Sequence, residues 1–179
     1  MFFYRHSRGF TLVEMLIVIA VIGIVAAIAV PGLLRARMSG NEASAIGSLR
    51  AVNSAEASYA SACANGGYAI TLSDLAAPPS GSNVGFISPD LASNGVFKSG
   101  YTHTMAKDAS AGVIDVSTTA ATCNGSASQP ASSYYASSVP AAPGRSGTRF
   151  FATDKRGTIF ADSSALIPNP IPSTALSVQ

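Results

Sequence analysis

Residues Met15 to Leu34 form a run of twenty residues without a charged side chain, MLIVIAVIGIVAAIAVPGLL. As an α-helix this run is about 30 Å long, which matches the hydrocarbon core of a membrane. Basic residues flank both of its ends: Arg5, Arg8, Arg35 and Arg37. The sequence therefore predicts one membrane-spanning helix near the N-terminus. Charge alone leaves its orientation open, and the short basic start favours an N-terminus on the inside.

Three interpretations of this segment compete. A secretory signal peptide would use the triplet Ala27-Ile28-Ala29, but the apolar run is longer than a usual signal core and Glu14 stands at its start. A simple membrane anchor accounts for the length and leaves Glu14 unexplained, although an acid just inside an apolar span usually marks a function. The third interpretation rests on the residues around Glu14.

The residues Arg8-Gly9-Phe10-Thr11-Leu12-Val13-Glu14 resemble the prepilin motif of type IV pilins and type II secretion pseudopilins. A short basic leader ends in Gly9, Phe10 follows, and the fifth residue after the junction is an acid. Gly23 and Pro31 stand where the first helix of that family carries a glycine and a proline. The resemblance covers about residues 5 to 37 and weakens beyond them.

The resemblance implies a role for each of these positions. A membrane-embedded aspartyl peptidase would cut between Gly9 and Phe10 on the cytoplasmic side and then methylate the new amine of Phe10. Glycine offers no side chain to obstruct a protease cleft. Glu14 would set the register of assembly by pairing with the ammonium group on Phe10 of a neighbouring subunit. The alternative is that the Glu14 carboxylate only extends to the lipid headgroups.

A second apolar pattern continues the helix beyond the membrane span. Apolar residues recur every three or four positions, which is typical of one face of an amphipathic helix: Ala45, Ile46, Leu49, Val52, Ala55, Tyr59 and Ala62. Arg37, Glu42, Arg50 and Glu56 are expected mostly off that stripe. We therefore expect one helix from Phe10 to about Ser61, with Pro31-Gly32 as its weak point. That point is either a fixed kink or part of a segment, from Gly23 to Pro31, that unwinds when subunits pack.

From Cys63 onward the chain is rich in Gly, Ser, Ala, Thr and Pro, with short apolar runs. We expect a helical turn at 72–75, a loop at 78–82, and strands at 101–105, 113–119, 149–153 and 158–161. The last two flank Asp154-Lys155-Arg156-Gly157 as a hairpin, which also resembles the closing hairpin of many bacterial pilin-like heads. The proline-rich tail at 167–172 should form neither helix nor strand.

These elements predict an α+β protein of type IV pilin-like architecture. A long N-terminal helix would pack on a small antiparallel sheet of three or four strands. The expected divisions are a leader at 1–9, a transmembrane and assembly helix at 10–34, an amphipathic half at 35–62 and a β-rich head at 63–179.

Cys63 and Cys123 are the only cysteines. Both would lie outside the cytoplasm, where an even pair favours a disulfide. The bond would tie the end of the long helix to the loop after the 113–119 strand. Two free buried thiols are the alternative.

The sequence does not favour an enzyme. His103 is the only histidine after residue 9, and the six aspartates of the head are dispersed near turn residues. No calcium loop, phosphate loop, C-x-x-C pair or nucleic-acid motif stands out, so no cofactor and no metal ligands are predicted. Asn124-Gly125-Ser126 fits an N-glycosylation sequon, which is a weak signal in a bacterial chain.

The resemblance implies a structural subunit of a type IV pilus-like filament. Its partners would be copies of itself, a prepilin peptidase and methyltransferase, an inner-membrane assembly platform and, before assembly, lipid. The subunit would cross the bacterial inner membrane once, with a cytoplasmic N-terminus, and then enter an extracellular pilus. The alternatives are a periplasmic pseudopilus that drives type II secretion and, less favoured, a membrane-tethered monomeric binding module.

The formal net charge of +2 arises from eleven basic and nine acidic side chains. Arg5 and Arg8 account for the excess, so a chain cut after Gly9 would have neutral side chains overall. A neutral protein of this kind is not expected to bind nucleic acid.

Overall fold

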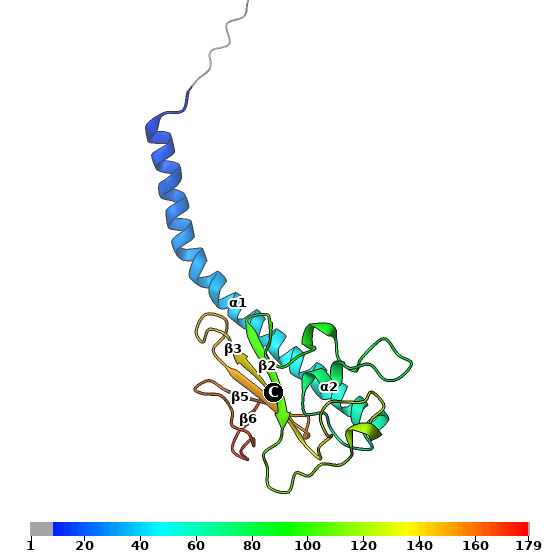
Figure 1. The fold of residues 1–179 in the computed structure, drawn as a ribbon. Coiled ribbons are helices and arrows are strands. Elements are labelled where there is room, and N and C mark those ends of the chain that lie inside the picture. The colour runs from blue at the N-terminus through cyan, green and yellow to red at the C-terminus, as the bar shows by residue number, and fades with distance from the viewer. Residues whose placement is uncertain (1–8, 179) are drawn as a thin grey trace, which may run out of the picture. The chain divides into compact units, whose positions relative to one another are not determined.

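The computed structural model describes residues 9–178, so Arg5 and Arg8 of the expected leader lie outside the described residues. The chain divides into two compact units, Met1–Arg37 and Met38–Gln179. One helix, α1 (Leu12–Ala62), contributes its first half to the first unit and its second half to the second unit. The arrangement within each unit is described separately (Figure 1).

The first unit consists of the apolar half of α1. Every side chain from Leu12 to Arg37 is exposed in the isolated chain. Within the described residues, α1 is the one helix that is long and apolar enough to cross a membrane. The helix begins two residues later than expected, at Leu12, because Thr11 caps its first turn. It continues without a break through Gly23, Pro31 and Gly32.

The second unit is built on an antiparallel sheet whose six strands lie in sequence order. The strands are β1 (Val96–Lys98), β2 (Tyr101–Lys107), β3 (Tyr134–Pro140), β4 (Phe150–Asp154), β5 (Ile159–Asp162) and β6 (Leu176–Ser177). A short helix, α2 (Leu72–Ala76), and two 3-10 turns, η1 (Pro89–Leu91) and η2 (Thr119–Ala121), lie in the connections. The predicted α+β architecture is confirmed.

The second half of α1 covers one face of this sheet (Figure 1). Its apolar stripe packs against apolar side chains of β2 to β5, and the fully buried large residues include Leu49, Tyr59, Tyr101 and Phe151. Two expectations about this stripe were wrong. Ala62 is exposed, because α1 ends there, and Glu42 and Glu56 lie on the buried face.

The C-terminal segment covers the opposite face of the sheet. Ile167, Ile171 and Ala175 pack against Tyr135 and Phe160 as a second, smaller core. The hydroxyl of Tyr135 also donates to the carbonyl oxygen of Ile167 at 2.5 Å. As expected, the proline-rich tail is neither helix nor strand, and a two-residue strand, β6, follows it.

The sheet has six strands where three or four were expected. One predicted strand is absent, and β1, β3 and β6 were not predicted. Residues 113–119 form no strand, because their pairing is limited to one isolated bridge between Asp115 and Ala131. Conversely, β3 was not predicted, although it pairs with β2 over seven residues from Tyr101–Pro140 to Lys107–Tyr134. Six of its seven residues are buried, since both faces of the sheet are covered, and this removes the polar–apolar alternation that identifies a strand.

Candidate functional site

The expected processing site lies just before α1. Gly9 and Phe10 precede the helix and both are exposed, with 76% of Phe10 accessible. A Cβ placed on Gly9 would meet no atom within 4 Å, so packing in this chain does not require glycine there. The bond between Gly9 and Phe10 is therefore in non-helical, accessible backbone, as a peptidase requires.

Thr11 and Glu14 form a reciprocal cap at the start of α1. The Glu14 carboxylate accepts from the Thr11 backbone N–H at 2.8 Å and from its hydroxyl at 2.7 Å. In return, the Glu14 backbone N–H donates to the Thr11 hydroxyl at 3.3 Å. This is a capping box, which satisfies backbone donors that a helix leaves unpaired at its first turn. The Thr-x-x-Glu spacing was visible in the sequence, but our prediction gave Thr11 no role.

The predicted weak points Gly23, Pro31 and Gly32 all lie inside α1. A Cβ on Gly23 or Gly32 would meet no atom within 4 Å, so the chain itself gives no steric reason for either glycine. Pro31 has no N–H to donate to the preceding turn, and glycine lowers helix stability by about 1 kcal/mol relative to alanine. These residues thus lower the intrinsic helix stability of this stretch of α1, which is helical here.

Cys63 and Cys123 form a disulfide, with sulfur atoms 1.99 Å apart. The expected pairing is confirmed, whereas the strand expected at 113–119 is absent and the turn η2 lies just before Cys123. The neighbouring Asn124 donates its side-chain N–H groups to the carbonyl oxygens of Asp74, at 2.7 Å, and Ala77, at 3.1 Å. The amide nitrogen of the apparent sequon is therefore engaged in holding α2.

Glu42 joins the second half of α1 to the sheet. Its carboxylate accepts from the Thr148 N–H and hydroxyl at 2.8 and 2.9 Å, and from the Arg149 Nε at 2.8 Å. Burial raises the pKa of Glu42, but the donors of Thr148 and Arg149 outweigh burial, so its pKa lies below the usual value. Nearby, the Asn41 side chain donates to the Ser146 carbonyl oxygen at 2.8 Å.

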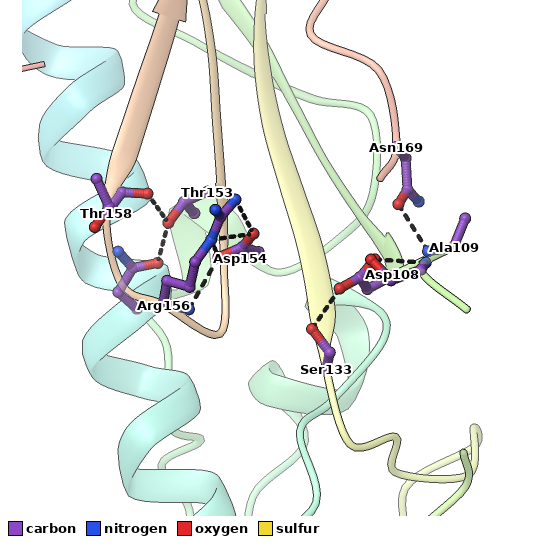
Figure 2. A network of polar contacts seen from close by, with 10 residues as sticks. Asp108, Ala109, Ser133, Thr153, Asp154, Arg156, Thr158 and Asn169 are labelled. Carbon is purple, nitrogen blue, oxygen red and sulfur yellow. Dashed lines mark hydrogen bonds and ion pairs between the residues drawn. The ribbon is translucent and has the colours of Figure 1, made fainter. Parts of the chain in front are cut away.

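A second set of polar contacts holds the β4–β5 hairpin and the end of β2 (Figure 2). Asp154 binds Arg156 through its Nε at 2.9 Å and its Nη at 2.7 Å, and the Arg156 guanidinium lies 4.6 Å from the centre of the Phe160 ring. Asn53 of α1 donates to the Gly157 carbonyl oxygen. This network connects α1 to the hairpin.

At the end of β2, Asp108 accepts from Ser110 and from the Ser133 hydroxyl, the latter at 2.6 Å (Figure 2). Asn169 accepts from the Ala109 N–H at 2.8 Å and donates to the Lys107 carbonyl oxygen at 2.9 Å. These bonds attach the C-terminal segment to the far end of the sheet.

His103 is a buried residue of β2 rather than an accessible base. Only 2% of it is exposed, and its Nδ1 lies 2.7 Å from the Ser138 hydroxyl. Burial, together with the positive charge of Lys98, lowers the pKa of His103 to about 4. Among the described residues, no three His, Cys, Asp or Glu side chains gather to hold a metal ion.

Comparison with known proteins identifies the N-terminal segment. Residues 4–30 match the family model described as the prokaryotic N-terminal methylation motif. Over 57 residues, 32% of this chain, the sequence is 40% identical to the type IV major pilin protein PilA of Myxococcus xanthus, of which 26% is covered. Over 38 residues, 21% of this chain, it is 55% identical to the type IV wide pilus major component PilA4 of Thermus thermophilus, of which 29% is covered.

The match thus spans between a quarter and a third of the length of these relatives. No solved structure matches the chain significantly. The resemblance to the type IV pilin family is confirmed over the segment that contains the Gly9–Glu14 motif.

Proposed function

We propose, from the premise that this chain carries the N-terminal segment of the type IV pilin family, that it is a structural subunit of a pilus-like filament. The observation that carries the proposal is the motif itself at the start of α1. Gly9 and Phe10 are exposed ahead of the helix, and an acid, Glu14, stands in the first turn of an apolar half-helix with no buried residue.

In the proposed sequence of events the chain first crosses the inner membrane once, with its N-terminus in the cytoplasm. A prepilin peptidase cuts between Gly9 and Phe10 and methylates the amine of Phe10. Because only Thr11 separates Phe10 from Leu12, the first residue of α1, the new ammonium group lies close to the positive end of the helix dipole. That end favours a carboxylate over a cation, so the ammonium group gains from an acid nearby.

Glu14 supplies that acid in the proposed filament. Within the chain its carboxylate is held by Thr11 through two hydrogen bonds, which fix its position in the first turn. The ammonium group of Phe10 on a neighbouring subunit would add a charge-assisted bond to the same carboxylate. Both charges would be removed from water in the filament, so each needs the other as its partner. Only one axial offset between neighbouring helices brings them together, and that offset is therefore favoured over others.

Assembly also covers the apolar surface of α1. The side chains from Leu12 to Leu34 are all exposed in the single chain, which is stable in lipid and unfavourable in water. Packing against the same segment of other subunits removes this surface from water after the subunit leaves the membrane. Gly23, Pro31 and Gly32 lower the helix stability where neighbours would pack, so local unwinding there is part of the proposal.

The experiment joins mass spectrometry with electron microscopy of sheared surface material from cells that express the chain. The proposal expects filaments whose subunits begin at N-methylated Phe10. Glu14→Gln should insert in the membrane at normal levels and form no filaments, because it loses the charge and keeps the size. Thr11→Val is the matched control: it loses the hydroxyl, keeps the backbone N–H of residue 11 that binds Glu14, retains the Glu14 charge and should still assemble.

Intact Met1 in the membrane fraction, together with the absence of filaments, would favour the membrane-tethered binding module. Short periplasmic fibres and loss of protein export on deletion would favour the pseudopilin. Normal filaments from Glu14→Gln would contradict the role of Glu14 in register.

A further inference from the structure

Glu56 is a fully buried acid in the second half of α1. None of its side chain is exposed, and its Oε2 accepts from the Ala69 backbone N–H at 3.0 Å. Its other oxygen, Oε1, has no hydrogen-bond partner among the described residues. An ionised carboxylate in this position would leave one charged oxygen without a donor inside the protein, which is strongly unfavourable.

The neighbours of Glu56 offer no positive charge. None of the four ion pairs formed by the described residues includes it. The ionisable groups that interact electrostatically with Glu56 are Asp74 of α2, Tyr134 of β3 and Tyr59 of its own helix. Burial, and then the negative charge of Asp74, raise the pKa of Glu56 well above its usual value, against the opposing effect of the Ala69 N–H.

Asp74, the other buried acid of this region, has more donors than Glu56. Its carboxylate accepts from the Thr71 hydroxyl at 2.7 Å and from the Ala127 N–H at 2.8 Å, with a longer contact of 3.4 Å to the Ser128 N–H. Glu56 has one donor and an unpartnered Oε1, so burial favours its neutral form.

The hydroxyl of Tyr59 is the other unpartnered polar atom in this region. Residues 56 and 59 are three positions apart on α1, so their side chains are neighbours on one helix face. A protonated Glu56 and a tyrosine each offer both a donor and an acceptor, whereas an ionised Glu56 has no proton to donate.

We propose that the proton on Glu56 is a pH-sensitive clasp that keeps the segment Cys63–Ala77 closed on α1. Ala69, which binds Glu56, and Asp74, which faces it, both belong to this segment. Loss of the proton places a negative charge in the interior on a carboxylate whose Oε1 has no donor. The segment then loosens from α1 as pH rises, while the disulfide at Cys63 keeps it attached. The clasp is independent of filament assembly.

The sign of the pH effect follows from linkage. In the unfolded chain Glu56 has an ordinary pKa of about 4.3, and in the folded chain it holds its proton to higher pH. The contribution of the clasp to stability is therefore complete below the unfolded pKa and declines as pH rises toward the folded pKa. Between the two values the unfolding equilibrium constant increases about tenfold per pH unit from this group alone.

The first test reads the proton directly. The chain contains three glutamates, Glu14, Glu42 and Glu56, so selective ¹³C labelling of glutamate carboxyl groups gives three resonances in the full chain in non-ionic micelles. Glu14→Gln and Glu42→Gln assign two of the resonances, and the third belongs to Glu56. We expect that resonance to titrate well above the ordinary pKa of about 4.3. A midpoint at about 4.3 or below, in protein with unchanged near-ultraviolet circular dichroism, would overturn the proposal.

The second test compares Glu56→Gln with wild type in urea unfolding and in hydrogen exchange. Glutamine keeps an acceptor for the Ala69 N–H and cannot ionise. Wild type should lose stability relative to Glu56→Gln as pH rises above the unfolded pKa of about 4.3, and the protection factor of the Ala69 amide should fall in wild type alone. Glu42→Gln, a change on the same helix, should leave that loss intact. Parallel pH profiles for wild type and Glu56→Gln would refute the clasp, and the resonance titration decides the matter if Glu56→Gln does not fold.

Discussion

The contribution of the disulfide to stability follows from the length of the loop that it closes. Cys63 and Cys123 are separated by 60 residues, and together they close a large loop in the unfolded state. In the chain-entropy description a loop of this length contributes about 4 kcal/mol to stability. We therefore expect the double change Cys63→Ala and Cys123→Ala to lower the free energy of unfolding by about 4 kcal/mol.

The folded structure around the bond should survive the change. Asn124 still donates to the carbonyl oxygens of Asp74 and Ala77, and the Ala127 N–H still donates to the Asp74 carboxylate. These contacts hold the Cys123 segment against α2 without help from the sulfur atoms. The loss of stability should therefore arise from the greater freedom of the unfolded chain, and the urea m-value should rise.

Urea unfolding of the full chain in non-ionic micelles measures this loss. The chain has no tryptophan and six tyrosines, four of which are buried in the second unit: Tyr59, Tyr101, Tyr134 and Tyr135. Tyrosine circular dichroism near 280 nm thus reports tertiary packing without interference from the apolar half of α1. Wild type treated with a reductant serves as the matched control and should coincide with the double variant.

A loss below about 1 kcal/mol with an unchanged m-value would refute the reasoning, because it would show that the unfolded chain is equally restricted without the bond. A loss of secondary structure in the double variant before urea is added would instead show that the Asn124 and Asp74 contacts do not hold the folded state.

Three further predictions concern single side chains. Glu42→Gln should lower the unfolding free energy by about 2 kcal/mol, since charge-assisted bonds to Thr148 and Arg149 are lost, and urea titration at pH 7 measures this. Because the folded pKa of His103 is about 4, against an ordinary value of 6.5, its contribution is complete above pH 6.5 and declines as pH falls toward 4. Relative to His103→Asn, wild type should lose about 2 kcal/mol between pH 6.5 and pH 5, and equal slopes in the two proteins would refute the assignment. Thr11→Val should accelerate amide hydrogen exchange in the first turn of α1, as expected for loss of a cap contributing about 1 kcal/mol, and unchanged exchange would contradict the capping role.

Local sequence patterns were sufficient to predict the elements whose signals lie within or next to their own residues. The uncharged run and the stripe after it predicted α1, and the turn residues Asp154 to Gly157 predicted the β4–β5 hairpin, whose Gly157 adopts a positive φ of 71°. Both signals lie within a few residues of the structure that they specify. The same is true of the Gly9–Glu14 motif, which the family comparison confirms over residues 4–30.

Strand β3 could not be predicted in this way, because its environment comes from distant residues. Ser137 and Ser138 would ordinarily mark exposed positions, yet both are buried, and the Ser138 hydroxyl lies against His103 of β2. The C-terminal segment closes one face of the strand and α1 closes the other. Ser138 is a core residue only because folding places His103, more than thirty positions away in the sequence, beside its hydroxyl.

The sequence by itself determined that the chain has an apolar N-terminal helix, a match to the N-terminal methylation motif and an α+β second unit. The tertiary structure decided the surroundings of each buried acid. Glu42, Glu56 and Asp74 are all buried, but Glu42 meets Arg149, Asp74 meets three donors, and Glu56 meets one donor. The physical reason is that a carboxyl group titrates according to the groups that folding places around it, and those groups are scattered along the chain.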